Sequence, residues 1–473
     1  MSSSLKAILS LIMLLNSCQL FAAGTSLVEV TKTGDVKAAQ TLLKSGSDIN
    51  QTSADGTTAL AHASHRNDLP MVDLLLQAGA DVNIANDLGA TALYLAAASA
   101  DEGLIKKLLD AGANPNAGLL SGETPLMAAT NRGKMATVKL LLDHDADPNA
   151  SESNSGQTGL MWAVADKHKE LVQLLVESEA DVHLGSKSGF TALMFAAQQG
   201  DLESAKILLA AGSQVDELMP KTGLTPLLIA SASGFEEVAT LLLERGASTA
   251  TLDSKGNTAL HLAVRNQNAL GVVKSLLKHG ANPNARLNHP KGKLLTPTEL
   301  NLQGATPLLL AADIDNYDAI TALLDAGADP KIPTEQKVTA LMMATGAGAA
   351  PSEERPAEVM AQALKTVKLL VDLGLDVNAI GHFGWTPLHL AAYHGENDVI
   401  KYLVEKGAKL NVMDGFGQTP LSISNAIVTE GIGDAYRQTP RSYRKETAEL
   451  LLSLGATPLE KSGVKRVSER ASR

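Results

Sequence analysis

Residue types that could carry out catalysis are scattered along this chain of 473 residues without the spacing of catalytic motifs. The sequence has no G-x-x-x-x-G-K-[S/T] phosphate loop, no H-E-x-x-H zinc helix and no G-x-S-x-G nucleophile turn. Asp313, Asp315 and Asp318 form an acidic cluster, but the glycine and distal glutamate of a calcium loop are missing. We interpret this cluster as a solvated helix end, and we expect no catalytic residue, no metal and no cofactor.

Aromatic residues are the second group of candidate functional residues, because they could bind a partner protein. The chain has six Phe, six Tyr and two Trp, and five of these fourteen fall between positions 383 and 416, four of them at positions expected to face a partner. Exposed, clustered aromatic side chains are typical anchors of protein interfaces, whereas packing against neighbouring loops is the alternative interpretation. With the two adjacent histidines, the candidate partner-binding residues are His382, Phe383, Trp385, Tyr393, His394 and Phe416.

The composition limits the kinds of partner. A net charge of −11 and a pI near 5.5 argue against a general nucleic-acid binder and against binding to acidic membranes. Hydrophobic residues make up 45% of the chain but aromatic residues only 3%. This balance suits thin helical layers that pack through alanine and leucine.

A repeat must position the candidate residues, because Thr-x-Leu recurs twelve times and nine of the eleven intervals are 33 or 34 residues. A fixed period in this range predicts stacked supersecondary units in place of one globular core. The threonines are Thr25, Thr58, Thr91, Thr124, Thr158, Thr191, Thr225, Thr258, Thr306, Thr339, Thr386 and Thr419.

The unit from Asp87 to Asn116 shows the expected local structure. Thr91 is predicted to cap a short helix over 92–98, and a second helix is predicted over 104–109. Gly112 is predicted to end this second helix in the left-handed conformation, and an extended segment leads to the next turn.

These units resemble the ankyrin repeat, most clearly at Thr386-Pro387-Leu388-His389-Leu390-Ala391-Ala392. The resemblance implies an all-α ankyrin-repeat solenoid of about twelve helix–turn–helix units with short hairpin fingers. It also implies that a protein partner binds along the concave face, formed by the fingers and the ends of the first helices. The candidate aromatic residues map to that face, and Phe190 with Gln198 and Gln199 forms a second, weaker patch. The family's histidine occurs only at His261 and His389.

The array is expected to cover 25–458, with insertions at 285–303, 346–360 and 426–442. The first should lengthen a finger, and the other two should separate the two helices of a unit. An enzyme with its site on the insertions is a distant alternative, and the titratable residues there include Arg286, His289, Lys291, Glu353, Glu354, Arg437 and Arg441. We expect 459–473 to be a disordered basic tail.

The N-terminal segment 1–24 is predicted to be a secretory signal peptide. It has a short basic start, a continuous apolar run over 7–15, and small residues at 22–24. A lipoprotein signal cleaved before Cys18 is the alternative, and Cys18 would then be a lipid anchor. We therefore expect a periplasmic or secreted protein, or else a membrane-anchored lipoprotein.

These inferences favour a non-enzymatic protein-binding scaffold or adaptor in the bacterial envelope. A secreted effector or toxin-neutralising ankyrin protein is the alternative. We expect a monomer that has no membrane span and binds no nucleic acid.

Overall fold

The structure is a computed structural model, and it describes residues 26–99, 102–288, 302–347, 357–381, 383–425, 427–429, 443–459 and 464–466. The chain divides into two compact units. Unit 1 comprises residues 1–199 and 203–213, and unit 2 comprises residues 200–202 and 214–473. Both units are built from pairs of short antiparallel helices, so the prediction of an all-α repeat fold is confirmed.

Each pair consists of a first helix, which follows the repeated threonine, and a second helix. In unit 1 the pairs are α2 (Leu27–Thr33) and α3 (Val36–Lys44), α4 (Ala59–His65) and α5 (Leu69–Gln77), α6 (Ala92–Ser99) and α7 (Glu102–Asp110), α8 (Pro125–Asn131) and α9 (Met135–Leu142), α10 (Gly159–Ala165) and α11 (Lys169–Glu177), and α12 (Ala192–Gln199) and α13 (Leu202–Ala210).

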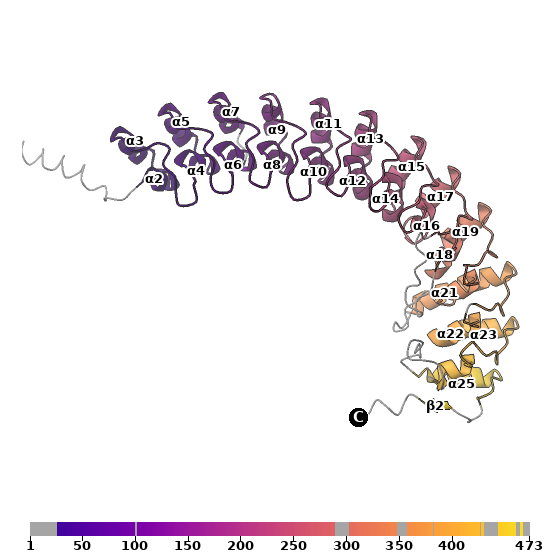
Figure 1. The fold of residues 1–473 in the computed structure, drawn as a ribbon. Helices are drawn as coiled ribbons and strands as arrows, with labels where there is room; N and C mark the ends of the chain where they lie inside the picture. The colour runs from indigo at the N-terminus through magenta and orange to yellow at the C-terminus, as the bar shows by residue number, and fades with distance from the viewer. Residues whose placement is uncertain are drawn as a thin grey trace, which may run out of the picture. The chain divides into compact units, whose positions relative to one another are not determined.

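Unit 2 repeats the same arrangement. Its pairs are α14 (Pro226–Ser233) and α15 (Glu236–Glu244), α16 (Ala259–Ala263) and α17 (Leu270–Lys278), α18 (Pro307–Asp313) and α19 (Tyr317–Asp325), α20 (Ala340–Ala344) and α21 (Ala357–Asp372), α22 (Pro387–His394) and α23 (Asn397–Glu405), and α24 (Pro420–Ser424) and α25 (Lys445–Ser453). Within each unit, first helices pack on first helices and second helices on second helices, which gives the two rows of Figure 1.

The two fixed residues of the Thr-x-Leu pattern have different structural roles. The threonine hydroxyl accepts a hydrogen bond from the backbone N–H three residues later, as at Thr58, Thr124 and Thr306, and so caps the first helix. The leucine two residues on is buried in every repeat, from Leu27 to Leu421, with at most 2% of its surface exposed. Each repeat therefore fixes where a helix begins and which side chain enters the core. The first repeat deviates slightly, because Ser26 caps α2 and Thr25 lies outside the described residues.

Hairpin fingers join the second helix of one pair to the first helix of the next. Neighbouring fingers within a unit are linked by backbone hydrogen bonds at their tips, such as Leu120 N to Leu88 O at 2.9 Å. The finger glycine two residues before the threonine permits this approach: Gly89 has φ 87°, and a Cβ there would lie 2.8 Å from Leu120 N. A side chain at this position would push the next finger away.

Asparagines at the base of the fingers connect successive repeats. Asn116 is typical: its side-chain nitrogen donates to Asp145 O at 3.0 Å, and its oxygen accepts from Asp147 N at 2.7 Å. Asn83 and Asn149 make the same pair of bonds in unit 1, as Asn284 and Asn378 do in unit 2. These bonds satisfy backbone groups left over at the end of each second helix.

The described residues at the ends of the predicted insertions show which elements these segments connect. Leu287 N donates to Ala305 O and Gly304 N to Leu287 O, so the first insertion extends a finger. The second and third separate α20 from α21 and α24 from α25, and α21 is lengthened to 16 residues as expected. Within the third insertion and the predicted disordered tail, β1 (Ile427–Thr429) and β2 (Val464–Arg466) form an antiparallel pair.

Candidate partner-binding site

Three of the predicted binding residues, all aromatic, lie on two neighbouring fingers of unit 2. The rings of Phe383 and Phe416 stack with their centroids 5.8 Å apart and their planes at 27°. The Trp385 indole N–H donates to Asp414 Oδ2 at 2.9 Å, which ties its finger to the next one. All three aromatic side chains are half-buried, so each is held in place and keeps an exposed edge.

Two of the predicted residues are not exposed, which corrects the sequence-based expectation. Tyr393 and His394, at the end of α22, retain 4% and 5% of their surface. Arg444 Nε donates to the Tyr393 carbonyl at 2.7 Å, and a Cβ on Gly346 would lie 2.5 Å from His394 Cδ2. These groups come from repeats on both sides of α22 and pack over its end. The packing interpretation therefore holds for Tyr393 and His394, while His382 lies outside the described residues.

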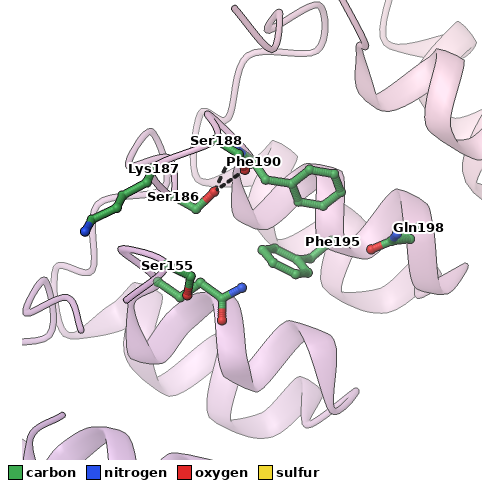
Figure 2. Close-up of a pocket in the computed structure, with 8 residues that line it drawn as sticks. Ser155, Ser186, Lys187, Ser188, Phe190, Phe195 and Gln198 are labelled. Carbon is green, nitrogen blue, oxygen red and sulfur yellow. Dashed lines mark hydrogen bonds between the residues drawn. The ribbon is translucent and has the colours of Figure 1, made fainter. Parts of the chain in front are cut away.

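Unit 1 contains a pocket of about 350 Å³ between two fingers and α12 (Figure 2). The Phe190 and Phe195 rings meet edge to face on one side, with centroids 4.6 Å apart and an interplanar angle of 72°. Both rings are half-buried. The pocket is lined by Ser155, Gln157, Ser186, Lys187, Ser188, Phe190, Phe195 and Gln198.

The two fingers that line this pocket are held by internal hydrogen bonds. Glu152 is 6% exposed, and its carboxylate accepts from the backbone N–H groups of residues 154, 155 and 157 and from the Ser155 hydroxyl. Burial raises the pKa of Glu152, but these bonds outweigh it and lower the pKa to about 2. In the second finger, the Ser186 hydroxyl accepts from Phe190 N at 3.1 Å and pairs with the Ser188 hydroxyl. The pocket walls are thus preorganised.

Sequence analysis found only part of this pocket. Phe190 and Gln198 belong to the predicted second patch, whereas Gln199 does not line the pocket and Phe195 was missed. A usable signal was present: the repeat that begins at Thr191 has an aromatic residue both immediately before and four positions after the threonine. No other repeat has this combination.

The two predicted family histidines are buried and hydrogen-bonded in unit 2. His261 Nδ1 bonds to Thr258, and Nε2 lies 3.2 Å from Ala305 O. His389 makes the equivalent bonds to Thr386 and to Gln418 O. Burial lowers the pKa of His261 to about 4 and also lowers the pKa of His389. Both histidines are therefore neutral structural groups at pH 7.

Other candidate sites gain little from the structure. Asp318 is exposed on α19, but Asp315 is only 3% exposed, so the expected solvated cluster does not include it. Of the titratable residues in the insertions, Arg286 is an exposed finger residue that donates to Pro333 O, and the other six lie outside the described residues. Cys18 and the predicted signal peptide also lie outside them.

Searches for two other kinds of site gave no candidate within the described residues. No group of three or more His, Cys, Asp or Glu side chains there could hold a metal ion. Of the helices in those same parts of the chain, none combines the length and the apolar character needed to cross a membrane.

Comparison with known proteins identifies the repeat. The family model described as ankyrin repeats (3 copies) matches residues 27–118, 97–186, 147–219, 193–286 and 358–429, and the model of a single ankyrin repeat matches 303–335. The chain belongs to the ankyrin-repeat family. Ankyrin repeats imply a scaffold for protein–protein interaction, and proteins built from them are generally non-enzymatic.

One curated relative is the human transient receptor potential cation channel subfamily A member 1. The two are 28% identical over 177 residues, which is 32% of this chain and 14% of the channel. The chain thus spans about one seventh of that relative's length.

Proposed function

We propose that this ankyrin-repeat protein is a non-enzymatic scaffold that captures another protein in the periplasm or at the surface of a bacterium. The partner lies against the fingers and the first helices. The envelope location rests on the basic and apolar pattern of residues 1–24. The binding role rests on the ankyrin fold and on the surface of the fingers.

The observation that carries the binding role is the position of exposed apolar side chains. Twelve large hydrophobic residues are exposed in the described parts of the chain, and six of them lie on fingers. They have between 42% and 79% of their surface exposed, a high value for such side chains on loops that are otherwise tightly hydrogen-bonded. The six are Leu88, Leu120, Leu218, Leu252, Ile380 and Met413.

A rigid, preorganised surface of this kind suits protein recognition. The finger backbones are linked to one another at their tips, so little conformational entropy is lost when a partner docks. Apolar side chains at repeated intervals provide contact area, and the half-buried Phe383, Trp385 and Phe416 provide aromatic anchors at the C-terminal fingers.

Photo-crosslinking in the producing cells tests the proposal. We would place p-benzoylphenylalanine at Ile380 or Met413 on fingers, and at Leu373, directly after α21, or Leu452 on α25 as exposed controls. We expect the same adduct at both finger positions, with at least a tenfold higher yield than at the control positions. Equal yields at fingers and controls, or no adduct, would refute the proposal.

Fractionation of the same cells tests the location. We expect the protein in the periplasmic fraction, unchanged by Cys18→Ala. Release from the membrane fraction by Cys18→Ala would identify the lipoprotein alternative, and recovery from the medium would identify the secreted effector.

A further inference from the structure

We infer that the pocket of unit 1 binds a specific sequence element of the partner, namely an aromatic side chain followed directly by a carboxylate residue. The inference rests on the proposed scaffold function and specifies the chemistry of one of its contacts. It uses the pocket lined by Phe190, Phe195, Lys187, Gln157 and Gln198.

The aromatic part of the inference comes from the two phenylalanines. Their edge-to-face contact leaves ring surface on the pocket side, because both rings remain half-buried after packing against each other. Aromatic rings prefer offset or edge-to-face neighbours, so a third ring can continue this arrangement. A volume of about 350 Å³ accommodates one large side chain and is too small for a folded element.

The position of Phe195 adds to this argument. It stands four residues after the threonine, where five of the six repeats in unit 2 bury an aliphatic residue or a methionine. Trp162 has the equivalent position in the preceding repeat and is also half-buried. Its indole N–H donates to the Gln157 side-chain oxygen at 2.8 Å. Large rings thus stand at the same position of two successive first helices, and one of them is hydrogen-bonded to a residue that lines the pocket.

The carboxylate part comes from Lys187, the one charged residue that lines the pocket. Its ammonium group donates to Ser153 O at 2.5 Å, and no carboxylate lies within ion-pair distance of it among the described residues. Glu152 of the neighbouring finger has its oxygens engaged by four donors of that finger. Figure 2 shows the lysine extending away from the two rings, so its charge acts at the rim of the pocket.

The remaining polar lining favours an acceptor on the partner. The Gln157 oxygen is already engaged by Trp162, so its amide nitrogen is the group available to an incoming residue. Gln198 is exposed on α12, and the serines carry hydroxyl groups. A lysine or arginine in the partner would meet one positive charge and no lining carboxylate. An aromatic–acidic pair is therefore the complementary element.

A peptide array tests this inference on the full chain. Twelve-residue peptides would carry a central pair made of Trp, Tyr, Phe, Leu or Ala followed by Asp, Asn or Lys. We expect peptides with Trp-Asp or Tyr-Asp to bind at least tenfold more tightly than those with Ala-Asp or Trp-Lys, measured by fluorescence anisotropy of labelled peptides.

Three variants locate the binding in the pocket. Gln198→Glu changes an exposed residue, so it should leave folding intact and weaken Trp-Asp binding about tenfold by repulsion. Lys187→Glu should reverse the preference, so that Trp-Lys binds better than Trp-Asp. Phe195→Ala should abolish the preference for an aromatic residue. Lys255→Glu on a finger of unit 2 and Leu262→Ala, at the position equivalent to Phe195, are the matched controls and should leave peptide binding unchanged.

Two results would overturn the inference: an array without a preference for aromatic–acidic pairs, or a preference that Lys187→Glu leaves unchanged. If either occurs while the finger crosslinks at Ile380 and Met413 persist, the scaffold function stands and the pocket inference alone fails. If the crosslinks are absent as well, the scaffold function fails with it.

Discussion

The two units of this chain expose apolar surface at different places, although they are built from the same repeat. One place is the helix-column position, the fourth residue after the threonine. In unit 1 it holds the half-buried Leu95, Trp162 and Phe195. In unit 2 the same position is buried in five of six repeats, at Ile229, Leu310, Met343, Leu390 and Ile423, each with at most 7% of its surface exposed.

The second place is the finger-base position, six or seven residues before the threonine, and here the relationship is reversed. Unit 1 has small or short residues at this position, namely Thr52, Ala85, Gly118, Ser151 and Gly185, and three of them form a β-bridge with the capping threonine. Unit 2 has Leu218, Leu252, Pro333, Ile380 and Met413, four of which are 42–59% exposed.

This difference shows that the repeat determines stacking and leaves the binding surface to a few positions. Unit 1 presents apolar groups from its first helices, beside a pocket, and from the finger tips at Leu88 and Leu120, whereas unit 2 presents them from the finger-base position. Each unit is therefore suited to a different kind of contact.

The largest effect is expected when a buried side chain at the helix-column position of unit 2 is truncated. Leu390→Ala removes a side chain that is 3% exposed, and it should lower the free energy of unfolding by about 3 kcal/mol. Leu95→Ala, at the same position in unit 1, should cost about 1 kcal/mol because that side chain is half-buried.

Denaturant unfolding measures the stability of both variants, and the fluorescence of the two tryptophans reports on the two units separately. Trp162 lies in unit 1 and Trp385 in unit 2, so each can be followed in a background where the other is replaced by phenylalanine. Equal losses at Leu390 and Leu95 would contradict the contrast in burial.

A pH-dependent effect of intermediate size is expected from His261, which is buried in unit 2. The pKa of His261 is about 4 in the folded state and near 6.5 in the unfolded state, so the unfolded chain binds more protons between these pH values. Stability should fall as the pH drops from 6.5 to 4, by about 2 kcal/mol at pH 5 from His261 alone. His389 adds to the loss, because its pKa is lowered as well.

His261→Met is the matched control, since methionine occupies the equivalent position at Met127, Met161 and Met194 in unit 1. The variant should be less stable at pH 7 but should lose less stability than the wild type between pH 7 and pH 5. His62 in unit 1 also has a pKa lowered by burial, but it is only half-buried. The unfolding transition followed by Trp162 should therefore shift less with pH than the transition followed by Trp385. If the free energy of unfolding changed equally with pH in the variant and the wild type, His261 would not be the source of this pH dependence.

Sequence reasoning was most successful where one residue type has one role in every repeat. Thr-x-Leu predicted the start of each first helix, because the threonine caps and the leucine is buried regardless of the neighbours. It was wrong about the exposure of Tyr393 and His394, since their burial depends on Arg444 and Gly346, about 50 residues away on either side. It missed Phe195 because an aromatic residue at a usual core position looks like packing until its exposure is known.

The smallest effect on stability is expected at the finger-base position, where the contrast concerns surface and not packing. Leu252→Ala in unit 2 and Ala85→Leu in unit 1 exchange an exposed leucine and an exposed alanine, so each should change the free energy of unfolding by less than about 0.5 kcal/mol. Binding should respond differently. Leu252→Ala removes apolar contact worth about 1 kcal/mol, and it should reduce capture of the partner crosslinked at Ile380 about fivefold. Ala85→Leu should leave that capture unchanged. A loss of more than 1 kcal/mol of stability in Leu252→Ala would mean that the finger leucines pack structurally, and the division of apolar surface between the two units would then be wrong.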